Sequence, residues 1–278
     1  MPDPRRLSSP SWLYPIRGLY YFIRHPYFWP LFSGRLLPVT LLSLLVFLFL
    51  LFFTYLPQVA FLAIFHGRHL ALINALFLVL GETAAIVALL FEAFFADETL
   101  VDVFDAVLID GGFEDLVLTN RVVKPTEDAH NSVKRLGKPF KSAIYSPFSF
   151  RQILEFVLLL PLNLIPVGGT PAFLILTGYR AGPLHHWRYF TLLNLSKKER
   201  KIFVKKRQMR YTWFGTIALI LQLIPVLSMF FLLTTAAGSA LWVIELEERR
   251  KYVESEAEAN TNRYRDDPPG YEAGESRN

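Results

Sequence analysis

The chain has 278 residues, of which 53% are hydrophobic and 15% aromatic, and its mean hydropathy of +0.32 is positive. Soluble domains of this length rarely have such a composition, so a membrane protein is the first expectation. The formal net charge is +5, and cysteine is absent, which excludes disulfides, thiolate zinc sites, palmitoylation and prenylation.

Two long apolar segments follow a basic N-terminal segment, residues 1–35. Residues 36–58 and 70–95 are each long enough to cross a bilayer, since a helical span takes about 20 residues. The short polar connection His66-Gly67-Arg68-His69 lies between the apolar runs. The sequence therefore predicts two full transmembrane helices that form an antiparallel pair.

Two later apolar segments, residues 152–179 and 213–244, are each interrupted by proline. The motif LNLIPV at Leu162–Val167 recurs as LQLIPV at Leu221–Val226, which is a shift of 59 residues. Duplicated segments of this kind recur in transport folds, where they often mark a binding site. The repeat suggests that both segments have the same broken helical structure.

The distribution of Lys and Arg predicts the topology. Residues 1–35 hold five of them and residues 180–212 hold ten, whereas the connection between the first two spans holds only Arg68. Short basic loops stay in the cytosol, so both basic segments are expected there, with the Arg68 turn on the other side. The segment 152–179 must then enter the membrane and return on the same side.

Length and backbone chemistry also favour re-entrant hairpins. Neither half of residues 152–179 is long enough to span about 30 Å at 1.5 Å per residue. Pro166 and Pro171 each remove a backbone donor, and the Gly168-Gly169 pair would permit a tight turn. Residues 213–244 are predicted to form a second hairpin with Pro225 near its turn, and a full span is the alternative.

The predicted fold is therefore an all-α, polytopic membrane protein with two full transmembrane helices, two Pro-broken re-entrant hairpins and amphipathic cytosolic helices. One membrane domain covers residues 36–251. A basic helix is expected at residues 196–212, because Ser196 and Glu199 have the spacing of a capping box. Residues 252–278 are polar and lack apolar periodicity, which predicts a disordered cytosolic tail.

The blocks PLNLIPVGGTPAFLILTGYRAGPLHHWRYF and RYTWFGTIALILQLIPVLSMFFLLTTAAGSALW resemble the etoposide-induced-protein/CysZ-like membrane family, over roughly residues 70–250. The fungal branch, with outer-spore-wall and lipid-droplet proteins, is the most similar. The resemblance implies two spans with partly penetrating hairpins. It implies sulfate permeation for bacterial relatives, and endomembrane or lipid-droplet residence with a part in spore-wall or lipid-linked assembly for the fungal branch. We expect a non-enzymatic protein of the fungal kind, and an anion permease is the alternative.

Several polar or helix-breaking residues inside the apolar segments are candidates for an ion or anion pathway. Glu82 lies near the middle of the second span, where a charged carboxylate must be neutral, paired or beside water. Its alternative role is structural, through bonds to the side-chain amides of Asn163 or Gln222 or to carbonyls freed by the prolines. Thr170 is expected to cap a half-helix whose N-terminus would favour an anion. The candidate pathway residues are Glu82, Asn163, Pro166, Gly168, Gly169, Thr170, Gln222 and Pro225.

The basic helix is a candidate for contact with anionic lipid headgroups, because each Lys or Arg near such a leaflet contributes about 1 kcal/mol. Its candidate contact residues are Lys197, Lys198, Arg200, Lys201, Lys205, Lys206, Arg207 and Arg210. A solvated helix that only fixes topology is the alternative. We expect no nucleic-acid partner beside membrane segments.

The remaining polar motifs have weaker functional interpretations. His185 and His186, with Trp187 and Tyr189, are expected at the membrane interface rather than around a metal. One face of the helix that contains Glu98, Asp102 and Asp105 is predicted to be acidic and solvated, and binding of a metal or a lipid headgroup is the alternative.

The tail contains a short motif that fits a protein partner. Pro268, Pro269 and Tyr271 form a PPxY motif of the kind that WW domains bind, which suggests a ubiquitin-ligase partner. No nucleophile–base signature or nucleotide-binding loop is present, so we expect no enzyme activity and no cofactor. The expected location is the endoplasmic reticulum or lipid droplets with both termini cytosolic, and a homo-oligomer stays open.

Overall fold

A computed structural model describes residues 10–95, 98–125, 131–139, 162, 165, 168–224 and 227–265. Over these residues the chain is mainly helical, with one two-stranded antiparallel sheet. The all-α prediction is confirmed at this level. Of the helices that the structure describes, Phe230–Thr261 alone is long and apolar enough to cross a membrane, and the bent pair Thr40–Phe53 and Tyr55–Phe65 could form a second span.

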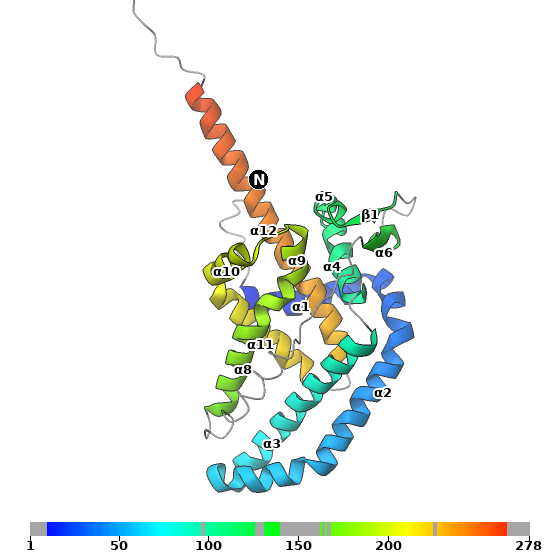
Figure 1. The fold of residues 1–278 in the computed structure, drawn as a ribbon, viewed down its shortest axis with the longest axis vertical. Helices are drawn as coiled ribbons and strands as arrows, with labels where there is room; N and C mark the ends of the chain where they lie inside the picture. Colours follow the sequence, from blue (N-terminus) through cyan, green and yellow to red (C-terminus); the bar gives the residue numbers. More distant parts are fainter. Residues whose placement is uncertain are drawn as a thin grey trace, which may run out of the picture.

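The first two apolar segments form a helical arm that is longer and more bent than the sequence suggested. Helix α2 covers Trp29–Phe53, and α3 covers Tyr55–Phe95 with a break at Gly67, where φ is 69°. In Figure 1, α2 and the second part of α3 run side by side, and the first part of α3 joins their far ends. The polar connection predicted at His66–His69 is thus confirmed as a helix break.

The first predicted span, residues 36–58, is not one continuous helix. Helix α2 ends at Phe53, and the chain bends by 54° between Thr40–Phe53 and Tyr55–Phe65. Pro57 explains the break, because it has no N–H to donate to the carbonyl of Phe53. At the end of α2 the Thr54 amide and hydroxyl both donate to the Leu50 carbonyl, at 2.8 Å and 2.7 Å.

The second half of the first predicted hairpin is helix α8, Gly169–Ala181, which packs against helix α11, Gln208–Gln222. Their backbones nearly touch, because a Cβ added to Gly215 would lie 2.4 Å from the carbonyl oxygen of Gly178. The first half of that hairpin, including Asn163 and Pro166, lies outside the described residues. A re-entrant path for residues 152–179 therefore stays a prediction.

The second predicted hairpin is broken where the repeated motif lies. Helix α11 ends at Gln222, and the 38-residue helix α12 covers Ser228–Arg265. Pro225 itself lies outside the described residues. Helix α12 extends well past Ile244 and past residue 252, where a disordered tail was predicted. The difference has a local cause, because this stretch is rich in Glu, Arg and Ala, and an Arg250–Glu254 pair at 3.5 Å supports the helix.

The N-terminal segment contributes to the fold around α12. The short helix η1 covers Ser11–Leu13, α1 covers Tyr14–Arg24, and η2 covers Pro26–Phe28. Helix α1 crosses α12 at close range, since a Cβ on Gly18 would lie 2.4 Å from the backbone nitrogen of Gly238. In Figure 1, α1 lies across the molecule at the upper end of the α2–α3 arm, and the distal half of α12 projects away.

A polar cap covers the upper end of the apolar helices (Figure 1). It consists of α4 (Glu98–Asp110), α5 (Glu114–Leu118), β1 (Arg121–Val123), α6 (Ser132–Arg135), β2 (Leu136–Pro139), η4 (Gly182–His186), α9 (Trp187–Leu192) and α10 (Lys197–Lys206). Strand β1 pairs antiparallel with β2, with Arg121 opposite Pro139 and Val123 opposite Leu136. Helix α4 packs on α12, and the main hydrophobic core includes buried side chains from both.

Candidate functional site

Glu82 forms a polar pair with Gln58 inside the apolar arm. Gln58 lies in the first part of α3 and donates through Nε2 to Glu82 Oε1 at 2.8 Å, and Glu82 is half-buried. The structural alternative for Glu82 was a bond to Asn163, Gln222 or a carbonyl freed by the prolines. Among the described residues its partner is Gln58, because the break at Gly67 folds the two parts of α3 against each other, and Asn163 lies outside the described residues. Gln222 Nε2 is buried without a hydrogen-bond partner among the described residues.

Thr170 forms a second polar contact with α3. Its hydroxyl donates to Asn74 Oδ1 of α3 at 3.2 Å, and Asn74 is buried. The prediction that Thr170 caps the half-helix is wrong, since α8 already begins at Gly169 with Gly168 as N-cap. Gly168 has φ −88° and ψ −18°, so this glycine continues the helical geometry instead of forming a turn with positive φ.

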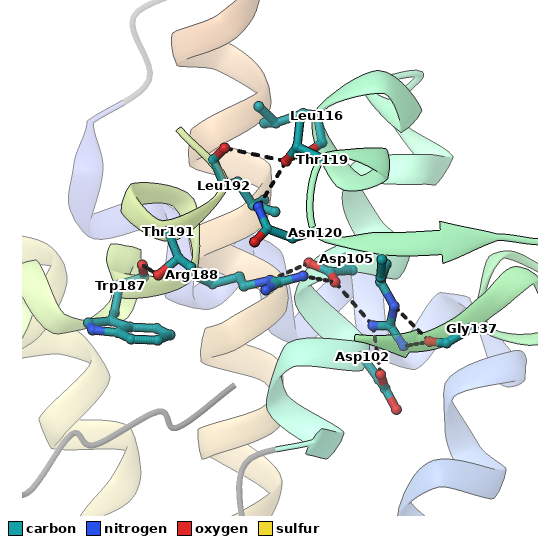
Figure 2. A network of polar contacts seen from close by, with 11 residues as sticks. Asp102, Asp105, Leu116, Thr119, Asn120, Gly137, Trp187, Arg188, Thr191 and Leu192 are labelled. Carbon is teal, nitrogen blue, oxygen red and sulfur yellow. Dashed lines mark hydrogen bonds and ion pairs between the residues drawn. The ribbon is translucent and has the colours of Figure 1, made fainter. Parts of the chain in front are cut away.

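A buried ion-pair network joins the parts of the polar cap (Figure 2). The Arg188 guanidinium of α9 donates from Nε to Asp105 Oδ1 at 2.9 Å and from Nη2 to Oδ2 at 2.6 Å. Arg121 of β1 donates from Nη1 to the same Asp105 Oδ2 at 3.0 Å and to Asp102 Oδ1 at 2.8 Å. Asp105 is completely buried, and both arginine side chains are at least 96% buried.

The predicted solvated acidic face is therefore wrong at Asp105. Helix α4 packs against α12 and against α5, α6 and β2, so nearly every residue from Thr99 to Ile109 is buried. Two carboxylates, Asp102 and Asp105, face two guanidinium groups, and their formal charges cancel. The network thus leaves no net positive charge for an anion, and it fixes α4, β1 and α9 relative to one another.

A cavity of about 20 Å³ lies beside this network and has room for a single water molecule. Its lining residues are Leu100, Val101, Phe104, His185, Arg188, Leu232, Ala236 and Ser239. The cavity is too small for a permeating oxyanion. We therefore place no pathway through it.

His186 is at the centre of an aromatic cluster, contrary to the predicted interface position. It is fully buried, its Nε2 lies 3.2 Å from the Ser239 carbonyl, and its Nδ1 lies 2.8 Å from the Tyr211 hydroxyl. A carbonyl only accepts, so Nε2 carries the proton and Nδ1 accepts from Tyr211. Burial lowers the pKa of His186 to about 3 and that of His185 to about 4.

Tyr189 is buried as well, so it does not anchor the chain at a membrane interface as predicted. Its hydroxyl donates to Glu247 Oε1 of α12 at 2.5 Å, and Glu247 also accepts from Arg250 Nη2 at 2.9 Å. The Tyr14 hydroxyl of α1 donates to Glu245 in a similar way. These bonds connect α9 and α1 to the middle of α12, where its apolar part ends.

The basic helix has the start that the sequence predicts. Ser196 Oγ accepts from the Glu199 amide, and the Glu199 carboxylate accepts from the Ser196 amide, which confirms the capping box. The helix ends at Lys206, earlier than residue 212. The exposed cations on it are Lys197, Lys198, Lys201, Lys205 and Lys206.

The three arginines of this region also make contacts within the protein. Arg200 Nε donates to the Leu195 carbonyl at 2.9 Å, and the Arg207 guanidinium lies 4.0 Å from the ring centroid of Phe203. Arg210 is on α11 and pairs with Glu245 at 3.6 Å. The five lysines therefore form the accessible basic surface, and the arginines mainly hold α10 and α11 in place.

A family model described as "Sulfate transporter CysZ/Etoposide-induced protein 2.4" matches residues 14–232. The chain belongs to the CysZ/etoposide-induced protein 2.4 family. No curated protein and no solved structure matches the chain. The family and the apolar helix Phe230–Thr261 together indicate an integral membrane protein. The match does not distinguish a fungal spore-wall branch.

Three further points compare the sequence of this CysZ-family chain with its structure: the PPxY motif, metal binding and the buried ion-pair network. The PPxY motif at Pro268, Pro269 and Tyr271 lies outside the described residues. No group of three or more His, Asp or Glu side chains in the described part of the chain could hold a metal ion. The buried Arg188–Asp105–Arg121 network was not predicted from the sequence. Its signal is a lone Asp105 inside the otherwise apolar run VFDAVLI of α4.

Proposed function

We propose that this chain is a non-enzymatic membrane permease for a small inorganic oxyanion of the sulfate class. The observation that carries the proposal is the Asn74–Thr170 hydrogen bond, which places the N-terminal end of α8 against a polar side chain of α3 in an apolar layer. The family description, which includes a sulfate transporter, is compatible with this function.

The chemistry at this end of α8 suits an anion. The helix dipole places partial positive charge at this end, although Pro171 has no N–H and the Gly169 amide already donates to the Ile165 carbonyl at 3.1 Å. Because Asn74 Oδ1 accepts from Thr170, the amide nitrogen of Asn74 keeps two N–H donors for an anion. Gly168 and Gly169 let the backbone approach a ligand closely.

Glu82 is the proposed coupling residue. A carboxylate within an apolar helix is costly unless it is neutral, paired or hydrated, and such residues commonly mark proton or ion pathways. Gln58 donates one hydrogen bond to it, and this bond is available in both protonation states because a protonated carboxyl group keeps one carbonyl oxygen as an acceptor. Proton transfer at Glu82 would offset the charge of an entering anion.

The proposed topology keeps the two spans and two re-entrant hairpins. Helix α2 has 25 residues and is about 37 Å long, enough for a hydrocarbon layer of about 30 Å. The α11–α12 pair is shallower, since only about 15 Å of helix separates Ser228 from Gly238, where α12 meets α1. If α1 marks the membrane surface, this pair reaches about half-way across the hydrocarbon layer.

The exposed lysines of α10 are proposed to contact anionic headgroups. All five project from one short helix that contains a single acidic residue, Glu199. Ile202 is exposed on the same helix and could rest in the headgroup region. Residence in the endoplasmic reticulum, cytosolic termini and a WW-domain partner remain part of the proposal. No observation favours spore-wall assembly or lipid droplets over this location.

Purified full-length protein in vesicles tests the transport proposal. Sulfate uptake should exceed that of empty vesicles, and Asn74→Ala or Thr170→Val should reduce it about tenfold, the effect of losing about 1.4 kcal/mol. Glu82→Gln should abolish any dependence of uptake on a pH gradient. Ser255→Ala, on the exposed part of α12, is the control and should transport normally.

Uptake equal to that of empty vesicles would rule out the permease. Strong binding of the same protein to vesicles that contain phosphatidylserine, lost at high salt, would then favour a non-transport role in lipid contact. Charge removal at the five lysines of α10 should weaken that binding. Substitution of Arg210, which pairs with Glu245 inside the protein, is not a clean test of it.

A further inference from the structure

Five large apolar side chains form an exposed stripe along the N-terminal helices. Trp12 of η1, Ile16, Tyr20 and Ile23 of α1, and Trp29 at the start of α2 are 43% to 61% exposed. The first four follow one another at intervals of four, four and three residues, which places them on one side of a helix. We name these five residues the N-terminal stripe.

The orientation of the stripe is fixed by the opposite side of α1. Tyr14, Gly18 and Phe22 are buried there, and Tyr14 stacks on Trp242 with ring centroids 5.8 Å apart. A Cβ on Gly18 would lie 2.2 Å from the Thr234 carbonyl oxygen, so α1 and α12 are in backbone contact. Helix α1 therefore cannot turn its apolar stripe inwards without leaving this packed site.

The chemistry of the stripe matches a membrane interface. Arg17 and Arg24 are exposed beside it, and the Arg24 guanidinium lies 5.3 Å from the Tyr20 ring centroid. Residues 10–30 contain no Asp or Glu. Trp and Tyr with flanking Arg are typical of the headgroup region, where the rings reach apolar tails and the cations face anionic lipid.

The position of α1 agrees with this chemistry. It leads through η2 directly into α2, the start of the apolar arm, and it lies across the upper end of that arm (Figure 1). We propose that η1 and α1 form an in-plane anchor, whose N-terminal stripe binds the lipid headgroup region of the leaflet in which α2 begins. The proposal rests on the membrane insertion of α2 and does not require transport.

Depth measurements on single labels test the anchor, and the absence of cysteine makes them clean. Nitroxide labels are attached to Ile16→Cys or Tyr20→Cys in the full chain, reconstituted in vesicles of phosphatidylcholine and phosphatidylglycerol. Labels at Phe52→Cys and Ser255→Cys, both exposed positions, are the references for lipid and water. Collisions of each label with oxygen and with a water-soluble nickel chelate are then measured.

The labels at positions 16 and 20 should lose most of the nickel-chelate collisions seen at position 255, while their oxygen collisions fall between the two references. Collisions like those at position 255 would overturn the anchor. Low collision rates with both reagents would also overturn it, because they would show that protein, such as a second copy, covers the stripe. If the label at position 52 is also aqueous, membrane insertion itself fails.

Discussion

The Asp105 carboxylate is completely buried and accepts three hydrogen bonds from two buried arginines. Replacing it with Asn leaves both guanidinium groups buried with less opposing charge. Removing one partner of a buried ion pair costs about 3–5 kcal/mol. We therefore expect Asp105→Asn to lower the free energy of unfolding by about this amount in detergent, measured by thermal or chemical denaturation.

Asp115→Asn is the matched control, because Asp115 is an exposed carboxylate in the same cap. Its effect should stay within about 0.5 kcal/mol, as is usual for surface substitutions. Equal stability of the two variants would show that the Arg188–Asp105–Arg121 network does not hold the cap together. Loss of sulfate uptake in Asp105→Asn without loss of stability would give the network a functional role instead.

His186 should make stability depend on pH. Burial lowers its pKa from 6.5 to about 3, so the unfolded chain binds a proton in this window and the folded chain does not. The free energy of unfolding therefore has its full value above pH 6.5 and decreases as the pH falls from 6.5 towards 3. Each pH unit costs about 1.4 kcal/mol, so His186 alone should cost about 2 kcal/mol at pH 5.

Unfolding curves at pH 7.5 and pH 5 measure this effect. His186→Gln should be less stable than the parent chain at pH 7.5 because the cluster is tightly packed, but its stability should fall less towards pH 5. His69→Gln removes an exposed histidine and should leave the pH slope unchanged. An unchanged slope in His186→Gln would mean that His186 does not stay neutral in the fold.

At the scale of elements, local signals in the sequence were informative. The capping box at Ser196 and Glu199, the break at His66–His69 and the break after Gln222 all follow from short-range chemistry and are present in the structure. The end of α2 was missed, although Pro57 carries the signal. Pro57 was included in the predicted span because the residues around it are apolar. Its missing N–H leaves the Phe53 carbonyl without a helical donor, and α2 ends at Phe53.

Long-range contacts were not predictable in the same way. Asp105 and Arg188 are 83 residues apart, and Glu82 pairs with Gln58 across a break whose geometry depends on Gly67. Helical periodicity assigned α4 one solvated face, yet neighbours cover both faces. The burial of His186 likewise depends on the packing of η4, α11 and α12, which no local pattern in the sequence specifies.

Ser196 allows a test of α10 as an independent element. Ser196→Ala removes the N-cap, which typically costs about 1 kcal/mol. The amides of α10 should then exchange hydrogen about fivefold faster, since 1.4 kcal/mol corresponds to a factor of ten. Ser255→Ala, whose hydroxyl bonds the Tyr252 carbonyl of its own helix at 2.8 Å, should not change α10. Equal exchange in α10 would show that contacts with α9 and α11, not the cap, stabilise it.

At the scale of the whole molecule, apolar and polar parts are separated along its length. The arm of α2 and α3 exposes many Leu and Phe side chains, whereas the cap and the distal half of α12 expose charged ones. Helices α8 and α11 lie between these regions and end before the tip of the arm (Figure 1). A membrane around the arm would therefore leave the basic helix and both ends of the described chain on one side.

The sidedness of three single cysteines tests this arrangement. Cysteines at Arg68, Asn194 and Ser255 replace exposed residues, and the native chain contains no competing thiol. In sealed, oriented vesicles, an impermeant maleimide should label Asn194→Cys and Ser255→Cys from the cytosolic side, and Arg68→Cys from the opposite side alone. This pattern follows because ten Lys and Arg lie in residues 180–212 and only Arg68 lies at the tip.

Labelling of Asn194→Cys and Arg68→Cys from the same side would refute the two-span arrangement. A glycan on Asn194, which begins the sequon Asn194-Leu195-Ser196, would contradict the cytosolic placement of α10.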